Sequence, residues 1–240
     1  ATVAEFETIL AGARQTSGKV LIPAFAVGRT QDLLFEMTKL HCAGRFAGAS
    51  VYVDSPMATD VTQLYRNHCD LWDAESRAMR SGGCTPLSFP GLRFTRTAEE
   101  SKKLNDLNHG TVVIAGSGMC NGGRIVHHLR NNLWKKDTRV VIVGFQAAGT
   151  LGRRLVDGQK TVRILGQEVA VQATIHTLGG FSAHAGQSGL MEWARAFSPR
   201  PERMVLTHGE PKARDALHAK IKTEPGVDAG RPKMFDEFEL

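Results

Sequence analysis

The sequence lacks several features that would place it in a special class of protein. Among its 240 residues no apolar run approaches the roughly 20 residues that a membrane-spanning helix needs, and no internal repeat or low-complexity tract is present. The first residues, ATVAEFETIL, have the apolar spacing of a helix rather than the basic region and cleavage site of a secretory signal. The cysteines at positions 42, 69, 84 and 120 form no C-x-x-C pair. These absences argue against a cysteine-based structural zinc site and predict a cytoplasmic protein with reduced cysteines and no membrane partner.

The composition is otherwise ordinary for a globular protein, with an excess of positive charge. Hydrophobic residues make up 42% and charged residues 22%, which is enough apolar material for one or two domains with a buried core. The formal net charge of +6 is compatible with an anionic partner such as RNA, although many proteins use such an excess only for solubility. The chain starts without methionine and enters a helix at once, so we expect it to be a fragment.

The first half of the sequence alternates short apolar strands with helices. Strands are predicted at 19–23, 51–54, 111–116 and 139–145, and helices at about 2–16 and 29–40 and after the second and later strands. Continuous apolar strands separated by helices predict an α/β fold with a parallel sheet covered on both faces. Residues 70 to 95, rich in Gly, Pro and Ser, interrupt the alternation and are expected to form an excursion or lid.

The pattern changes near residue 160. Residues 161–178 alternate apolar and polar side chains around Gly166–Gln167, which predicts a hairpin with its turn at that pair. A helix at about 187–197, a strand at 203–208, a helix at 211–222 and a polar segment ending in a short strand or tail are expected to follow. We therefore expect two domains, at 1–157 and 158–240.

Four turns follow the predicted strands and precede helices. They are PAFAVGRT (23–30), DSPMAT (54–59), GSGMCNGGR (116–124) and GFQAAGTLGRR (144–154). Ligands of open parallel sheets bind beyond the carboxyl ends of the strands, and the free N–H groups of a helix N-terminus suit phosphate oxygens. These turns therefore predict a phosphate-binding edge.

The third turn is the most suggestive because its four glycines allow a ligand to approach the backbone closely. Arg29 and Arg124 lie at helix starts, where a cation opposes the helix dipole, and a bound phosphate would remove that conflict. The turn matches neither G-x-G-x-x-G with an acidic ribose partner nor G-x-x-x-x-G-K-[ST], so a mononucleotide site lacks its usual motif. Glycines that only make tight turns are the alternative interpretation.

Two histidines lie at positions that suit metal binding or proton transfer. His208 ends an apolar strand and precedes a helix, a position that suits a metal ligand, and His184 in FSAHAG begins a helix and could donate a proton near neutral pH. The alternative for each is a hydrogen-bonded structural histidine, which is also our interpretation of His127, His128 and His176. Two histidines do not make a zinc site, since three or four ligands are needed.

These segments resemble the β-CASP branch of the metallo-β-lactamase superfamily, which includes the pre-mRNA 3′-end endonuclease and bacterial RNA-degrading proteins. The matching segments run in the family order across about residues 18 to 220: KVLIPAFAVGRTQDLL, VYVDSPMA, VVIAGSGMCNGGRIVHHL, VIVGFQAAGTLGRRL, IHTLGGFSAHAGQ and VLTHGE. The prokaryotic RNA-processing members are the most similar. The resemblance implies a β-CASP cap domain at 1–157 and the C-terminal part of a metallo-β-lactamase αββα fold at 158–240.

The resemblance also implies a function, zinc-dependent hydrolysis of RNA phosphodiester bonds with two zinc ions in the intact protein. His208 matches a zinc ligand of the family and is typical of its RNA-acting members, whereas DNA-acting ones tend to carry valine. His184 matches the histidine beside the scissile phosphate, a candidate general acid. A homodimer is compatible with such folds. The residues expected to bind RNA or phosphate are Arg29, Ser55, Ser117, Gly118, Met119, Gly123 and Arg124.

The sequence departs from the family pattern in two ways. Gly186 stands where the family often has aspartate, and the H-x-H-x-D-H signature, the later ligands and an acidic residue of the family's first motif are absent. In the family these lie before the β-CASP domain, so we expect a truncated chain that does not cleave RNA by itself. A non-catalytic RNA-binding module of the same fold and a phosphate- or nucleotide-binding α/β domain are the alternatives.

Overall fold

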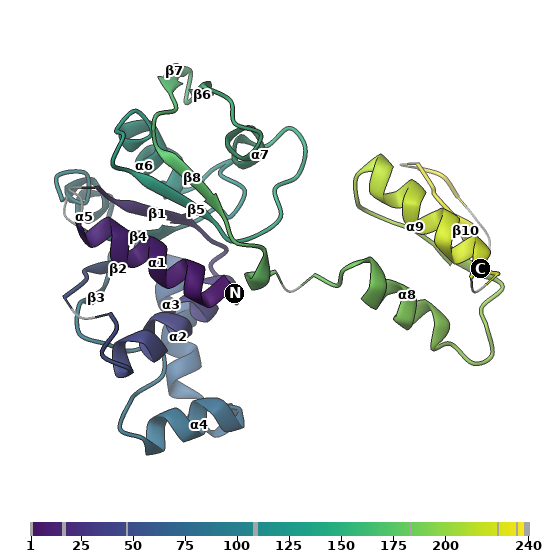
Figure 1. Cartoon of the computed structure of the whole chain (residues 1–240), viewed down its shortest axis with the longest axis horizontal. Coiled ribbons are helices and arrows are strands. Elements are labelled where there is room, and N and C mark those ends of the chain that lie inside the picture. The colour runs from purple at the N-terminus through teal and green to yellow at the C-terminus, as the bar shows by residue number, and fades with distance from the viewer. Residues whose placement is uncertain are drawn as a thin grey trace. The chain divides into compact units, whose positions relative to one another are not determined.

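The computed structural model describes residues 2–15, 18–46, 48–107, 110–182, 184–224, 226–233 and 235–237. It divides into two compact units, Ala1–Ser182 and Ala183–Leu240, which are described separately (Figure 1). Within these described stretches, no helix combines the length and apolarity that crossing a membrane requires.

The larger unit is built on a parallel sheet of six strands in the order β3-β2-β4-β1-β5-β8 (Figure 1). The strands are β1 Val20–Pro23, β2 Val51–Val53, β3 Leu92–Phe94, β4 Val112–Ala115, β5 Arg139–Ile142 and β8 Thr174–Thr177. Every residue of the central strands β1 and β4 is buried, as expected for strands covered on both faces. The α/β fold with a parallel sheet, predicted from the apolar runs, is confirmed.

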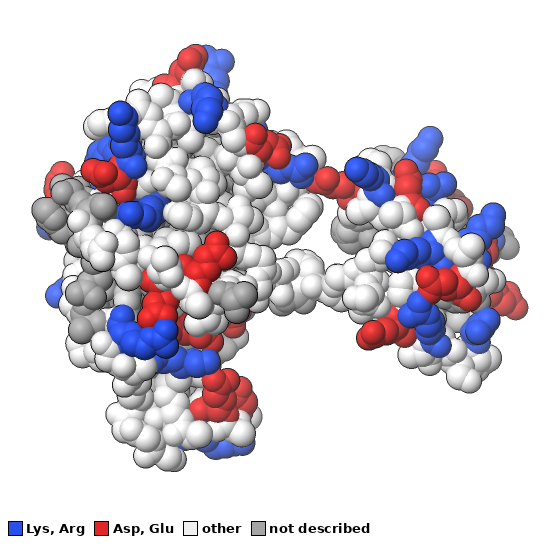
Figure 2. Space-filling view, in the orientation of Figure 1, with Lys and Arg blue, Asp and Glu red and all other residues white. Residues whose placement is uncertain are grey.

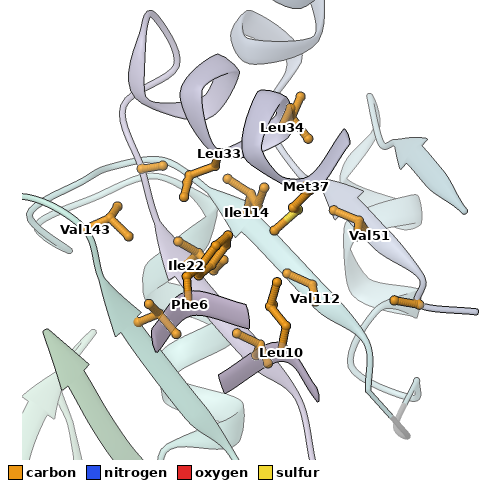
Figure 3. Packing of buried hydrophobic residues seen from close by; sticks show 14 of the residues in the cluster. Phe6, Leu10, Ile22, Leu33, Leu34, Met37, Val51, Val112, Ile114 and Val143 are labelled. Carbon is orange, nitrogen blue, oxygen red and sulfur yellow. The ribbon is translucent and has the colours of Figure 1, made fainter. Parts of the chain in front are cut away.

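Helices cover both faces of this sheet. They are α1 Thr2–Gln15, α2 Arg29–Cys42, α3 Pro56–Asn67, α4 Ala74–Ser81, α5 Ala98–Lys103, α6 Arg124–Asn132 and α7 Leu151–Val156, with short 3₁₀ turns η1 Cys69–Leu71 and η2 Gly179–Phe181. Alternate residues of one strand enter opposite cores: Ile22 packs with α1 and α2 (Figure 3), whereas Leu21 packs with α6 and α7. This alternation follows from the period-2 geometry of a strand and anchors the helices whose N-termini form the site.

Two connections differ from the predictions. Residues 70 to 95 do not form only an excursion, because after η1 and α4 they supply the edge strand β3. The hairpin consists of β6 Thr161–Ile164 and β7 Gln167–Ala170, and its turn lies at Leu165–Gly166, where both residues have positive φ. The apolar residues after the hairpin pair instead with β5 as strand β8. Alternation predicts a strand but not its partner.

The cysteines also differ from the prediction. Cys42, at the end of α2, forms a disulfide with Cys84, after α4, so the expectation of reduced cysteines is wrong for this pair. Cys69 and Cys120 are free, and burial raises the pKa of the Cys120 thiol to about 12. Burial therefore keeps Cys120 in its unreactive thiol form near neutral pH.

The smaller unit contains α8 Gln187–Arg195, β9 Arg203–Val205, α9 Pro211–Thr223 and β10 Asp228–Gly230. The two strands pair in parallel, and β10 is the short strand expected in the polar closing segment. Its core joins Met191 and Ala194 of α8 to Met204 of β9 and Ile221 of α9. The helices and strand predicted between 187 and 222 are all present.

Candidate nucleic-acid interface

A hollow of about 370 Å³ lies at the carboxyl ends of β1, β2 and β4. Because parallel strands end at the same edge of a sheet, three of the four predicted turns, 23–30, 54–59 and 116–124, meet there. The lining residues that carry the argument below are Phe25, Ser55, Met57, Ser117, Gly123 and Arg124. The fourth turn does not line the hollow, although Gln146 Nε2 donates a hydrogen bond of 2.9 Å to the carbonyl oxygen of Gly118. Three of the four predicted turns thus share one concave surface.

The walls of this hollow are largely apolar. The Phe25 side chain is 51% exposed and Met57 is 63% exposed, so both present apolar surface to solvent beside the hollow. The backbone of Gly118 packs against the Phe25 ring, since a Cβ atom at Gly118 would lie 2.8 Å from Phe25 Cε2. The glycine therefore lets the third turn close on the aromatic ring, an arrangement that suits a flat apolar ligand surface better than a phosphate.

The third turn is closed by its own backbone hydrogen bonds. The Ser117 N–H donates to the Gly122 oxygen at 3.0 Å, and the Ile125 N–H donates to the Gly116 oxygen at 3.0 Å. Gly123 has a φ of 71°, and a Cβ there would lie 2.3 Å from the Gly116 oxygen, so only glycine fits. The Gly116–Ser117 peptide bond is cis. The buried Ser117 Oγ has no hydrogen-bond partner among the described residues, which leaves a polar atom for a ligand to satisfy.

Asp54, directly after β2, is the polar centre beneath the hollow and is fully buried. Its Oδ1 accepts from Arg124 Nη1 at 2.6 Å and from the Thr95 hydroxyl, and its Oδ2 accepts from Ser101 Oγ at 2.6 Å and from His128 Nε2 at 2.6 Å. Burial by itself would raise the pKa of this carboxyl, but the hydrogen bonds from His128, Ser101, Thr95 and Arg124 hold the pKa well below its ordinary value. Asp54 is therefore a carboxylate that fixes three elements of the sheet edge.

The predicted cations at the helix starts have acidic partners in this structure. The Arg124 guanidinium pairs with Asp54 and also donates to the Arg96 carbonyl oxygen at 2.7 Å. Arg29 Nη1 pairs with Asp32 Oδ2 at 2.8 Å in the first turn of α2, and Arg29 does not line the hollow. A carboxylate therefore relieves the conflict between each cation and its helix dipole, and a phosphate is not needed for this.

The other predicted contacts divide into two groups. Ser55, Ser117 and Gly123 line the hollow, and Ser55 Oγ also caps α3 by accepting from the Ala58 N–H at 3.2 Å. Gly118 and Met119 do not line it. The Met119 carbonyl oxygen accepts instead from the Gly152 N–H at 3.2 Å, which ties the third turn to the fourth.

Sequence reasoning missed the residues that build this edge from below. Asp54 could have been found from the sequence, because a charged residue directly after a buried strand lies at the ligand edge of the sheet. His128 lies one helical turn after Arg124, on the same face of α6, and both contact Asp54. The interpretation of His128 as a hydrogen-bonded structural histidine fits its burial and this contact. Thr95 and Ser101 gave no local signal.

His184, the predicted general acid, and His208, the predicted zinc ligand, both belong to the smaller unit, and both are exposed. His208 follows β9 with a φ of 62° and precedes α9, and His184 precedes α8. Across the part of the chain that the structure describes, no group of three or more His, Cys, Asp or Glu side chains could hold a metal ion. The described residues therefore do not supply a complete zinc donor set.

Figure 2 shows how charged side chains are distributed on one face of the smaller unit. On the face drawn in Figure 2, basic and acidic side chains are interspersed over the smaller unit, so the net charge of +6 is not gathered there into one basic surface. On that face, recognition of an anion would therefore depend on local groups rather than on a broad field.

The fold and the sheet-edge turns define a class of protein. The Beta-Casp domain family matches residues 30–155, and the Zn-dependent metallo-hydrolase RNA specificity domain family matches residues 168–232. The chain belongs to the β-CASP family of the metallo-β-lactamase superfamily, as the sequence motifs predicted.

The chain is similar to individual proteins of this family. The chain is 43% identical to Ribonuclease TTHA0252 of Thermus thermophilus over 210 residues, which cover 87% of this chain and 47% of the relative. It is 30% identical to the transcription termination factor FttA of Pyrococcus abyssi, over 93% of this chain and 35% of the relative. It is 31% identical to the FttA protein of Methanocaldococcus jannaschii, over 80% of this chain and 31% of the relative. The chain thus spans about half or less of the length of these relatives.

Proposed function

We propose that this chain is the RNA-binding part of a zinc-dependent ribonuclease and that the hollow at the ends of β1, β2 and β4 contacts the RNA strand. The observation that carries the proposal is the convergence of three strand-end turns on one hollow in a chain of the β-CASP family. The similarity to a ribonuclease and the match to an RNA specificity domain support RNA as the ligand. We assign residues 1–157 to the β-CASP domain and 158–240 to the returning part of the metallo-hydrolase domain.

The groups around the hollow suggest how RNA would bind. The charge of Arg124 is balanced by Asp54, and the exposed walls are the apolar side chains of Phe25 and Met57. Aromatic and apolar surfaces bind unstacked bases of single-stranded RNA. We propose that a base lies against Phe25 and Met57, and that Ser117 Oγ and the backbone near Gly123 contact the sugar and phosphate. Arg29, Gly118 and Met119 would support these contacts from the same turns.

The family is zinc-dependent by the description of its RNA specificity domain. We propose that His208 is one zinc ligand of the complete protein, that two zinc ions bind there, and that His184 lies beside the scissile phosphate. The described residues do not supply the remaining donors, so this chain alone should hold zinc weakly and should not cleave RNA. No catalytic step is assigned to it.

Two further proposals concern location and assembly. A cytoplasmic location, expected from the cysteine pattern, is one, and the Cys42–Cys84 disulfide counts against it because such bonds are rare in reducing compartments. A homodimer is the other, and light scattering of the purified chain would test it.

Binding of a labelled single-stranded RNA, followed by fluorescence anisotropy, tests the proposal directly. We expect binding that weakens as salt rises and that exceeds the affinity for mononucleotides and for DNA of the same sequence. Added zinc should produce neither stoichiometric tight binding nor cleavage. Preference for a mononucleotide over the oligonucleotide would favour a nucleotide-binding domain and contradict the RNA assignment.

A further inference from the structure

A second hollow, of about 310 Å³, lies where the loop before α6 meets α7 and β6. It shares Gly123 with the first hollow, so the two adjoin along the loop 116–124. The polar side chains that line it are Asn121, His127, Arg154 and Arg163. None of the residues that the structure places in its lining is acidic.

The two arginines differ from Arg124 because, among the residues that the structure describes, no carboxylate forms an ion pair with them. Neither Arg154 nor Arg163 has an ion pair within the described stretches, and the buried Arg154 Nε has no hydrogen-bond partner there. The neighbouring Arg153, by contrast, pairs with Asp157 at 2.9 Å. Two guanidinium charges that have no ion pair within the described stretches favour an anionic acceptor in the hollow that they line.

The nearest acidic group in the hairpin register is Glu168, which stands opposite Arg163 across β6 and β7. The Arg163 Nε instead donates to the Gly166 carbonyl oxygen at 3.2 Å, which holds this side chain at the hairpin end. The Asn121 Oδ1 accepts the Leu151 N–H at 3.1 Å, so its amide group is fixed with its donors still available. The hollow therefore combines two guanidinium groups, an imidazole and an oriented amide.

We infer that this second hollow binds a phosphate group, and that in the proposed function this group belongs to the RNA strand whose base occupies the first hollow. Guanidinium groups recognise phosphate through paired, charge-assisted hydrogen bonds, and the oriented amide adds a neutral donor. That the phosphate belongs to RNA rests on the proposed function. That the second hollow binds a phosphate group rests only on the side chains that line it. The inference also divides the contacts: the apolar first hollow takes the base, and the basic second hollow takes a phosphate beside Gly123, which lines both hollows.

The test compares three arginine-to-glutamine variants of the chain, each of which removes one charge. R154Q and R163Q change the second hollow, and R130Q is the matched control because Arg130 lies in the last turn of α6 and does not line the hollow. We expect RNA affinity to fall about tenfold in R154Q and in R163Q, as for the loss of one charge-assisted contact. The slope of log affinity against log salt should fall by about 0.7 for each lost phosphate contact, and R130Q should change neither.

Inorganic phosphate, followed by ³¹P NMR, separates the sources of the phosphate group. Binding of RNA and of inorganic phosphate that both weaken in R154Q supports the inference. If R154Q and R163Q bind RNA with unchanged affinity and slope, the inference is overturned while the proposed function stands.

Failure of the wild-type chain to bind RNA would instead sink the proposed function. In that case, phosphate binding that weakens in R154Q would still support an anion site in the second hollow. If the wild-type chain bound no phosphate either, the anion site would also be refuted. Arg163 is exposed on the hairpin, so R163Q keeps the test valid even if R154Q fails to fold.

Discussion

Asp54 Oδ2 and His128 Nε2 lie 2.6 Å apart in the interior, although 74 residues separate them in the sequence. This contact joins the end of β2 to the middle of α6 directly beneath the candidate RNA-binding hollow. With Arg124 on the other carboxylate oxygen, it fixes two of the turns that line the hollow. The site therefore depends on a buried network of Asp54, His128 and Arg124, of which only Arg124 was a predicted ligand contact.

We expect Asp54→Asn to destabilise the larger unit by about 3 kcal/mol, because removing one partner leaves the other groups of a buried pair uncompensated. The free energy of unfolding in urea measures this effect. Asp60→Asn is the control, since Asp60 pairs with Arg96 on the exposed surface at 2.8 Å and should contribute about 1 kcal/mol or less. Equal losses in the two variants would show that the Asp54 network does not stabilise the fold.

The sequence predicted the parts of this site that depend on local patterns. Apolar runs predicted the strands and hence the edge at which the turns at 23–30, 54–59 and 116–124 would meet, and the structure places those turns around one hollow. The charge state of the edge was not predictable in the same way. Arg124 was expected to await a phosphate, but its partner Asp54 lies 70 residues away and meets it only when β2 and β4 pair.

The pairing partners of two strands were likewise not predictable from local sequence patterns. The residues of β3 follow a segment of Gly, Pro and Ser, and those of β8 follow a hairpin, so each was assigned to its local neighbours. Both nevertheless complete the edges of the parallel sheet. Periodicity states which face of a strand is buried, whereas its neighbours are set by packing between distant segments.

Lys19 gives a prediction for alkaline pH. Its side chain is buried and donates to the carbonyl oxygens of Leu104 and Asn105, and burial, with a smaller effect of Lys135, lowers its pKa from 10.5 to about 8. Between these two values the unfolded chain binds more protons than the folded chain, so stability should rise with pH across that range through this group.

The variant Lys19→Met isolates this contribution, because every other titrating group is shared with the wild-type chain. We expect the stability difference, wild type minus variant, to increase from pH 8 to pH 10.5, measured by urea unfolding at several pH values. A difference that stays constant across the range would mean that the pKa of Lys19 is not lowered in the folded chain.

Phe25 tests whether the first hollow takes a base. Phe25→Ala should weaken binding of single-stranded RNA about tenfold or more, because stacking of one base on an aromatic ring contributes roughly 1–3 kcal/mol. Phe145→Ala is a matched control: Phe145 is 56% exposed against 51% for Phe25, but it does not line the hollow. An RNA with an abasic residue at each position in turn should reveal one position at which the Phe25 variant loses nothing further. Equal losses for the two phenylalanine variants would refute a base-specific role.

Gly118 tests the same ring from the opposite side. A Cβ at Gly118 would lie 2.8 Å from Phe25 Cε2, so Gly118→Ala must displace the ring, whereas a Cβ at Gly144, which lines neither hollow, meets nothing within 4 Å. Since the Phe25 side chain is half exposed, its displacement should change the free energy of unfolding by about 1 kcal/mol or less. RNA affinity should nevertheless fall as it does in Phe25→Ala, while Gly144→Ala should retain it.

The double variant Gly118→Ala, Phe25→Ala decides between loss of the ring and distortion of the loop. If the glycine acts only by letting the ring take its place, the effects will not add, because the second change removes a surface that the first has already displaced. Additive losses of RNA affinity, measured by anisotropy at fixed salt, would mean that Gly118 contacts the RNA through its own backbone. The Phe25 ring would then contribute to RNA binding independently of the glycine.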